Sequence, residues 1–325
     1  MFDEHESQDG DRPFAVIRDH HVAGIIIFVT AFCGAFANYI ILSLIDKVSS
    51  LQNVFGRLTF NQAIGEAVHL TIFTLYFAPT VFFDIKFLKS EAVSRIFGHI
   101  NLVCYDICIY SHLVISSNRL TAIYFPFKYN TIFSTRNVQV MVVAVYVLAI
   151  VPSLYMYIYQ DCRLIYSDAY WNFDFTKTQA CYVVGMYGDF ARYVLTVTMI
   201  ALLDVVTFVK VRISSVKVNI DDSAARKKRQ NEITFVKQVC LQGVVFVCEL
   251  ITYFFMADAF ESKWARFFLT TFAWIQVHSF DAYITLFFNK GFFRAIRLSL
   301  LSSNHFQSTD TYAKPQRAES QSIKH

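Results

Sequence analysis

Five carboxylates interrupt long apolar stretches of the sequence. They are Glu66, Asp106, Asp204, Glu249 and Asp281. A carboxylate at membrane depth is costly, so it usually faces the interior of a helix bundle and takes part in function. We expect four side chains to line a polar pocket that binds or orients a small ligand. They are Tyr105, Asp106, Glu249 and His278. The structural alternative, in which Asp106 only hydrogen-bonds to a neighbouring helix, stays open.

The composition places these carboxylates in a membrane protein. Of the 325 residues, 55% are hydrophobic and 17% are charged, and the mean hydropathy is +0.40. A soluble domain carries about 25% charged residues, and disordered chains carry fewer apolar ones. With 10 Gly, 5 Pro and 7 Cys, the chain fits neither collagen-like nor disulfide-scaffold proteins. A polytopic membrane protein remains.

Seven apolar windows are long enough to cross a bilayer, since a spanning helix needs about 20 apolar residues. They cover residues 22–45, 58–83, 96–124, 137–160, 186–209, 233–257 and 264–288. We therefore expect an all-α membrane protein, a bundle of seven transmembrane helices. Most Lys and Arg residues lie in the loops on the same side as the C-terminal tail, and cytoplasmic loops collect positive charge. The N-terminus is then outside.

These spans divide the chain into four parts. Residues 1–21 form an extracellular N-terminus, residues 22–289 the seven-transmembrane domain, and residues 302–325 a cytoplasmic tail. Between the last two, residues 290–301 place apolar side chains on one helical face with basic ones beside it, which predicts an amphipathic interfacial helix. The net charge of +4 follows from this topology and gives no reason to expect nucleic acid as a partner.

Basic residues on the inner side have two interpretations. One group precedes the sixth span and consists of Arg226, Lys227, Lys228 and Arg229. Anionic inner-leaflet lipids attract such a run by about 1 kcal/mol per residue near the surface. Contact with a protein partner is equally open. Arg119, at the inner end of the third span, is either an interface residue reaching toward phosphates or a partner-facing residue.

Two cysteines, Cys162 and Cys181, fall in the loop between the fourth and fifth spans, on the oxidising outer side. We expect them to form a disulfide, so that the closed loop covers the mouth of the bundle. The remaining cysteines lie within spans, where packing is their expected role. The sequence shows no nucleophile elbow, P-loop, dinucleotide motif or metal-spaced His/Cys set, so we expect neither an enzyme nor a bound cofactor or metal.

The third span carries the most specific pattern. It reads NLVCYDICIYSHLVISSNRLTAIYFPFKY, in which a polar residue and Arg119 precede an aromatic-Pro-x-x-Tyr stretch. This pattern resembles rhodopsin-like G protein-coupled receptors. Together with FGRLTFNQAIGEAVH in span two and DVVTFVKVR in span five, it more narrowly resembles the nematode serpentine chemoreceptors of class X, from about residue 34 to residue 294.

The resemblance assigns a role to polar residues inside the bundle. Gly34 and Asn38 match a Gly-x-x-x-Asn motif of span one, in which the Asn anchors neighbouring spans. In span two, Asn61 and Glu66 fall where these receptors carry Asn and, five residues on, Asp. Asp281 takes the place of the Asn in the Asn-Pro-x-x-Tyr motif of span seven. The resemblance thus implies an interior polar network of Asn38, Asn61, Glu66 and Asp281.

The inner motifs are partly altered. Arg119 matches the Arg of the Asp-Arg-Tyr triplet, but its neighbours are Asn118 and Leu120, which removes the carboxylate that usually restrains the Arg. Ala282 and Thr285 replace the kinking Pro and the switching Tyr of span seven. The resemblance favours a partner-facing Arg119. It also implies that Asn118 and the basic run of residues 226–229 contact a G protein.

One departure from the family pattern on the outer side concerns the disulfide. Ser94 stands where these receptors carry a span-three Cys, which strengthens the pairing of Cys162 with Cys181.

Two further departures on the outer side restrict the class of ligand. Asn101 occupies the pocket position at which amine receptors carry Asp, so a biogenic amine is disfavoured, and Asn101 joins the candidate pocket residues. The outer half of span seven carries no Lys to which retinal could attach, so a light receptor is disfavoured.

The resemblance implies a multi-pass receptor of the plasma membrane, in a sensory cilium, that binds a small odorant or metabolite and activates a heterotrimeric G protein. Two alternatives stay open. The missing Asp, Pro and Tyr also suit a receptor-like protein that binds without signalling, and the buried acids suit a transporter or proton relay. Against a transporter, the sequence shows no internal repeat and no Gly/Pro-broken span.

Overall fold

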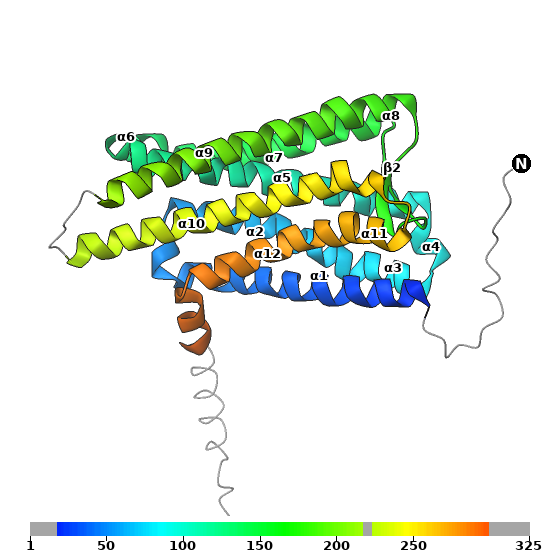
Figure 1. The fold of residues 1–325 in the computed structure, drawn as a ribbon, viewed down its shortest axis with the longest axis horizontal. Coiled ribbons are helices and arrows are strands. Elements are labelled where there is room, and N and C mark those ends of the chain that lie inside the picture. Colours follow the sequence, from blue (N-terminus) through cyan, green and yellow to red (C-terminus); the bar gives the residue numbers. More distant parts are fainter. Residues whose placement is uncertain (1–17, 217–222, 299–325) are drawn as a thin grey trace, which may run out of the picture.

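The protein is a bundle of long helices that run along one axis (Figure 1). The computed structural model describes residues 18–216 and 223–298. Within these residues, six helical stretches are long and apolar enough to cross a membrane. They are Asp19–Lys47, Val54–Phe83, Glu91–Tyr124, Thr135–Ile158, Gln179–Ile213 and Ile233–Ala259. A seventh stretch, residues 263–288, runs beside span one, so the predicted seven-helix bundle is confirmed.

The spans are built from the following elements. Span one is α1 (Asp19–Leu44), followed by the short turns η1 (Ile45–Lys47) and η2 (Ser49–Leu51). Span two consists of α2 (Val54–Ile72), η3 (Phe73–Phe77) and α3 (Ala78–Phe83). Span three is α5 (Glu91–Tyr124), between the short helices α4 (Lys86–Lys89) and α6 (Pro126–Ile132), and span four is α7 (Thr135–Ile158).

The last three spans are segmented near their outer ends. Span five consists of α8 (Gln179–Val183), η4 (Val184–Phe190) and α9 (Ala191–Val216). Span six consists of α10 (Ser223–Ile251), η5 (Thr252–Met256) and η6 (Ala257–Ala259), and span seven of α11 (Lys263–Phe267), η7 (Phe268–Phe272) and α12 (Ala273–Phe288). Spans five and six continue inward beyond the predicted windows, because a helix can extend past the apolar layer into polar sequence.

Four of the described spans contain a π-helical stretch, and all four stretches lie in the outer half of the bundle. These stretches are η3, η4, η5 and η7. A π-helical turn widens the helix and changes the direction of the side chains that follow, and such turns are frequent at functional sites. The outer half is therefore the part of the bundle in which to look for a ligand site.

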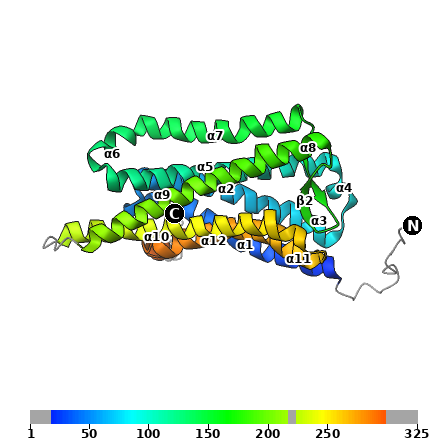
Figure 2. The same cartoon turned by 45° about the horizontal axis from the view of Figure 1, so that its top comes forward.

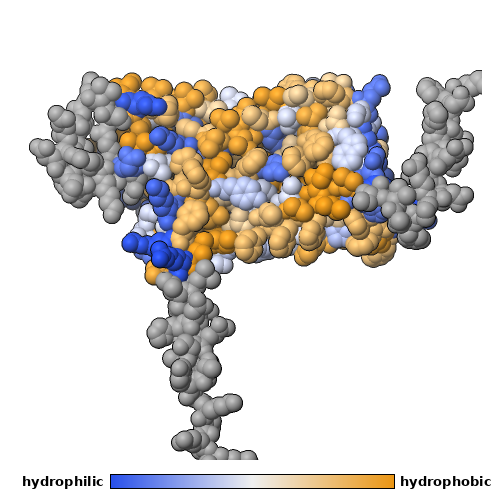
Figure 3. Space-filling view, turned by 60° about the horizontal axis from the view of Figure 1, so that its bottom comes forward, coloured by the Kyte–Doolittle hydropathy of each residue, from blue (hydrophilic) through white to orange (hydrophobic). Residues whose placement is uncertain are grey.

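The helices pack through small residues and expose aromatic ones to lipid. On α1, Gly34 lies so close to α12 that an added Cβ would come within 2.1 Å of the Ser279 Oγ. Small residues permit this approach of membrane helices. The opposite face of α1 exposes Phe28, Phe32 and Phe36 by 46%, 51% and 59%. Figure 3 shows the resulting surface, mostly hydrophobic in the middle and hydrophilic toward both ends.

A β-hairpin covers the outer end of the bundle. It pairs β1 (Leu164–Ser167) with β2 (Asn172–Phe175), with Leu164 opposite Phe175. Figure 2 shows β2 at the same end as α3, α4 and α11. The loop that carries the hairpin is closed by the predicted disulfide between Cys162 and Cys181, which is confirmed.

Hydrogen bonds and charges attach the hairpin to the outer loops. Lys89 contacts Asp84 and also donates to an oxygen of Asp168 at 2.6 Å, and the Tyr166 hydroxyl donates to the same Asp168 oxygen at 2.7 Å. Burial lowers the pKa of Lys89, but the hydrogen bonds to Asp168 and Asp84 outweigh it and raise this pKa overall. Burial raises the pKa of Asp168, but the bonds from Lys89 and Tyr166 lower it overall. Lys89 and Asp168 therefore stay charged at neutral pH.

The inner end carries a further helix. Residues 291–298 are helical, and they turn away from the bundle axis after α12 (Figure 1). Phe292 is fully buried against the bundle, whereas Phe293 is 59% exposed. This arrangement agrees with the amphipathic helix expected over 290–301. Its last residues, the tail from 302 and residues 1–17 lie outside the described residues.

Candidate functional site

A cavity of about 580 Å³ opens between the hairpin loop and the outer ends of spans five, six and seven. Its lining residues include members of the π-helical stretches η4, η5 and η7. Three carboxylates border it, from Asp174, Asp189 and Asp258, and two basic residues, Lys177 and Arg266. Cavities of this size suit a small organic ligand.

A second, deeper cavity of about 30 Å³ continues toward span three. It shares Phe175, Asp189, Tyr253 and Phe254 with the larger cavity, so the two adjoin. Its remaining wall is mostly apolar and aromatic with one acid, and consists of Leu102, Tyr105, Leu164, Tyr193, Glu249 and Trp274. The path thus leads from the outer surface to a narrow polar end inside the bundle.

Tyr105 and Glu249 form this polar end. The Tyr105 hydroxyl donates a hydrogen bond of 2.9 Å to Glu249 Oε2, which joins span three to span six. Both side chains are buried, with exposed fractions of 3% and 6%. A ligand that offers its own donor to Glu249 therefore competes with the Tyr105 hydroxyl.

An arginine from span five pairs with two carboxylates beside the deeper cavity. Arg192 Nη2 lies 3.0 Å from Asp106 Oδ1 and 3.1 Å from Asp189 Oδ1. The Tyr193 hydroxyl donates to the same Asp106 oxygen at 2.7 Å. Asp106 is fully buried, so it contacts neighbouring side chains and borders neither cavity. This is the hydrogen-bonded arrangement that the structural alternative for Asp106 describes.

The predicted pocket residues do not all meet. Tyr105 and Glu249 line the deeper cavity, whereas Asn101, Asp106 and His278 line neither of the two cavities. Asn101 and His278 are fully buried between helices. The His278 ring packs against the ring of His69, with 4.2 Å between the centroids.

The predicted interior network is partly connected, through a residue that the sequence did not single out. Gln62 donates to Glu66 Oε1 at 3.0 Å and also to Asp281 Oδ2, so one amide joins spans two and seven. Asn61 donates instead to Ser111 Oγ on span three at 2.9 Å. Asn38 donates to the Gly34 carbonyl one turn earlier, at 3.2 Å.

Two glutamines of span six complete the contacts with span seven. Gln238 and Gln242 donate to Thr285 Oγ1 at 3.0 and 3.1 Å. Asn289 donates to Gln238 Oε1 at 2.9 Å. Thr285 stands at the Tyr position of the Asn-Pro-x-x-Tyr motif of span seven. It accepts the hydrogen bonds that hold the inner halves of spans six and seven together.

Arg119 lies at the inner end, packed against two adjoining aromatic rings. Its guanidinium carbon is 3.7 Å from the ring centre of Phe55 and 4.4 Å from that of Phe235. We call Phe55 and Phe235 the aromatic clamp, since their rings lie 4.7 Å apart and join spans two, three and six around Arg119. The guanidinium is thereby held inside the bundle, and Arg119 is only 5% exposed.

The other candidates for contact with a G protein are Asn118 and the basic run of residues 226–229. Asn118 donates to the Tyr129 hydroxyl at 3.1 Å, which connects span three to α6. The basic run, Arg226 to Arg229, forms part of the inner extension of α10, but its side chains lie outside what the structure describes.

Five residues of these clusters were not predicted from the sequence, namely Arg192, Asp189, Gln62, Gln238 and Gln242. A signal existed for Arg192, because an arginine inside the apolar window 186–209 requires a counter-charge. The glutamines gave a weaker signal, since an uncharged amide is tolerated in many positions of a membrane helix.

Comparison with known proteins gives consistent matches. The family model described as serpentine type 7TM GPCR chemoreceptor Srx matches residues 28–289. Serpentine receptor class X 45 of Caenorhabditis elegans is 36% identical over 292 residues, which cover 85% of this chain and 81% of that protein. Serpentine receptor class X-43 of the same organism is 27% identical over 289 residues, which cover 87% and 89%.

A solved structure shares the fold. The crystal structure of squid rhodopsin superposes with a TM-score of 0.67 at 14% sequence identity, and the match covers 94% of this chain and 98% of that chain. The seven helices of the bundle and the family match over most of the chain lead to one conclusion. The chain belongs to the serpentine chemoreceptor class X (Srx) family of seven-transmembrane G protein-coupled receptors.

Proposed function

We propose that this receptor binds a small extracellular odorant or metabolite and activates a heterotrimeric G protein at the plasma membrane. The observation that carries the proposal is the pair of adjoining cavities, which lead from the outer surface to the Tyr105–Glu249 hydrogen bond. The family and the rhodopsin-like fold support a receptor of this type.

The deeper cavity has room for one small polar group, so its chemistry favours a ligand whose body lies in the larger cavity and whose hydrogen-bond donor reaches into the deeper one. Its walls include the rings of Tyr105, Tyr193, Phe254 and Trp274. Glu249 is the hydrogen-bond acceptor at the inner end of this cavity. A ligand donor that replaced the Tyr105 hydroxyl at Glu249 would loosen the contact between spans three and six. Such a change favours one packing of the bundle over another, which is the requirement for a ligand-driven switch.

The inner face supplies the output. In the proposed active packing, Arg119 leaves the aromatic clamp and faces the G protein, with Asn118 and the basic run of residues 226–229 as further contacts. The same basic run also suits anionic inner-leaflet lipid, which would hold the inner extension of span six near the membrane. A sensory cilium is the proposed location, in line with the chemoreceptor family.

The proposal is tested by measuring G protein activation in cells that express the receptor, against pooled small odorants and water-soluble metabolites. Arg119→Ala should abolish the response to an active pool while surface expression stays intact. Arg136→Ala is the matched control, since this arginine is exposed near the inner start of span four, and it should respond as the parent does. An undiminished response of Arg119→Ala would contradict the assigned output role.

Glu249→Gln separates ligand binding from coupling. It keeps the size of the side chain and replaces the carboxyl acceptor with an amide, so the concentration for half-maximal response should rise by about tenfold, as expected for the loss of one hydrogen bond of about 1.4 kcal/mol. A pool that binds the receptor in a thermal-shift measurement but never activates a G protein would instead favour the non-signalling alternative.

A further inference from the structure

Two buried carboxylates border the deeper cavity, and one of them has no described cation as partner. Asp189 and Glu249 belong to spans five and six and are exposed by only 4% and 6%. Asp189 pairs with Arg192, but Arg192 also pairs with Asp106. No ion pair between described residues includes Glu249. Three carboxylates thus share one described guanidinium, although a buried carboxylate needs a cation or a proton.

Glu249 also has an acceptor atom to spare. Its Oε2 atom accepts the hydrogen bond from the Tyr105 hydroxyl, whereas no described residue donates to its Oε1 atom. Other buried polar atoms of the bundle lack a described partner as well, but Glu249 borders a cavity that adjoins the outer one. A buried acceptor without a donor is costly, so this oxygen points to a donor that enters the cavity from outside.

The rest of the wall suits a positively charged donor. Six aromatic residues border the deeper cavity, namely Tyr105, Phe175, Tyr193, Tyr253, Phe254 and Trp274. The face of an aromatic ring attracts a cation, and cages of such rings bind ammonium groups in proteins. Carboxylates and ring faces together therefore favour a cationic group over a neutral or an anionic one.

The basic residues along the path border only the larger cavity. Lys177 and Arg266 line that cavity and are absent from the wall of the deeper one. Lys177 is exposed, and Arg266 lies 3.6 Å from Asp258 and 4.3 Å from the ring centre of Tyr170. A cationic group that reaches the deeper cavity therefore leaves these two positive charges behind.

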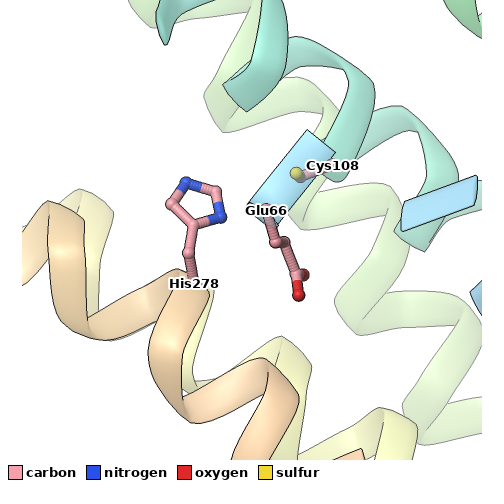
Figure 4. A group of neighbouring side chains, drawn as sticks. All are labelled: Glu66, Cys108 and His278. Atoms are coloured by element: carbon pink, nitrogen blue, oxygen red, sulfur yellow. The ribbon is translucent and has the colours of Figure 1, made fainter. Parts of the chain in front are cut away.

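The other polar groups of the bundle do not compete for such a ligand. Figure 4 shows Glu66 beside Cys108 and His278, and none of these three residues borders either outer cavity. Asn101 borders neither cavity, so its neutral amide, which disfavours an amine at the position that amine receptors use, does not face the path. The acids that a ligand meets in the deeper cavity come instead from spans five and six.

We propose that the ligand is an organic cation whose primary ammonium group binds in the deeper cavity, between Glu249 and Asp189. This inference rests on the proposed function, because it names the class of ligand for the same two cavities. A primary ammonium has three N–H donors. One reaches Glu249 and another reaches Asp189, while Arg192 stays paired with Asp106. The body of the ligand lies in the larger cavity.

The size of the deeper cavity restricts the cationic group further. A volume of about 30 Å³ holds little more than one water-sized group. A primary ammonium is a compact point charge and fits this space. Three methyl groups on the nitrogen would exceed it and would also remove the N–H donors. The receptor should therefore distinguish a primary amine from its quaternary counterpart, although both are cations.

The test measures ligand binding to the purified full-length chain in detergent, by thermal unfolding, and needs no G protein. Three probes share one body and differ in the end group: benzylamine, benzyl alcohol and benzyltrimethylammonium. Benzylamine should raise the unfolding temperature, because it binds the folded state. Its dissociation constant should be at least about tenfold below those of the other two, as charge-assisted hydrogen bonds require. Equal binding of benzylamine and benzyl alcohol, or no binding of benzylamine, would overturn the proposal.

Variants locate the ammonium group. Glu249→Gln should weaken benzylamine binding by about tenfold and leave benzyl alcohol binding unchanged, which also shows that the variant is folded. Asp189→Asn should act in the same direction. Glu261→Gln is the matched control, since this acid is exposed in the outer loop before span seven and borders neither cavity. Equal losses in Glu261→Gln and Glu249→Gln would show that the general charge of the outer face attracts the amine, and would reject the site.

This inference and the proposed function fail separately. If benzylamine binds with the stated preference but no primary amine activates a G protein, the ligand class stands and the signalling function falls. If neutral molecules activate the receptor and Glu249→Gln responds to them as the parent does, the signalling function stands and the ligand class falls.

Discussion

Arg192 determines the charge balance beside the deeper cavity. It is the described counter-charge of both Asp106 and Asp189, which are exposed by only 0% and 4%. A buried ion pair contributes little net stability, but the removal of one partner leaves an uncompensated charge. The arginine is therefore required because the carboxylates are present.

The first prediction is that Arg192→Gln destabilises the receptor strongly. The loss should be about 3 to 5 kcal/mol, because two buried carboxylates lose their counter-charge. It appears as a lower thermal unfolding temperature of the purified protein. Adding Asp106→Asn to this variant should restore part of the stability, since one of the two charges is then gone.

The exposed Arg95 on α5 provides the control for this prediction. Arg95→Gln should change the stability by no more than about 0.5 kcal/mol, as is usual for a surface substitution. Equal unfolding temperatures of the two arginine variants would show that the cluster around Arg192 does not contribute to the stability of the fold.

At the scale of elements, the long helices were predictable and the outer loop was predictable only in part. The spans follow from apolar windows of about 20 residues, a requirement set by the bilayer. The disulfide between Cys162 and Cys181 followed from topology. The hairpin did not, because strands of four residues, Leu164–Ser167 and Asn172–Phe175, are too short for an alternating pattern to be distinctive.

The position of the hairpin depends on a glycine of span three. An added Cβ at Gly98 would lie 2.1 Å from the Leu164 carbonyl oxygen, so only glycine permits the strand to approach α5 this closely. We expect Gly98→Ala to displace the hairpin, lower stability by about 1 to 3 kcal/mol as overpacking does, and accelerate trypsin cleavage between residues 160 and 178.

Gly185 offers the matched substitution, because an added Cβ there meets nothing within 4 Å. Gly185→Ala should leave both stability and cleavage near the parent values, since alanine also suits a helix better than glycine. If Gly98→Ala behaves like Gly185→Ala, the close approach of the hairpin is not a constraint on the folded protein.

At the scale of the molecule, the candidate sites depend on the rotation of each span, which periodicity in an apolar helix fixes poorly. The sequence therefore placed Tyr105, Glu249 and His278 in one pocket, whereas the bundle turns His278 toward Glu66 and Cys108. Asp204 is a similar case. It stands six and eight residues before Lys210 and Arg212 in the sequence, but these cations lie over the rings of Tyr124 and Phe208.

The aromatic clamp connects the inner ends of three spans around the buried guanidinium of Arg119. The last prediction is that Phe55→Leu raises ligand-independent signalling, because leucine keeps the apolar contact but loses the ring face that attracts Arg119. A cation–π contact contributes about 0.5 to 2 kcal/mol, which corresponds to a basal increase of roughly twofold to tenfold if the released packing is the active one.

Phe60→Leu on the same helix tests whether this effect is specific, since Phe60 is 37% exposed and belongs to the outward face of α2. Its basal G protein activation, normalised to surface expression, should equal that of the parent. The double variant Phe55→Leu/Arg119→Ala should be silent, because the released guanidinium is what the G protein would contact. Raised signalling that survives the loss of Arg119 would mean that the clamp restrains the spans by packing alone and that the arginine is not the group it withholds.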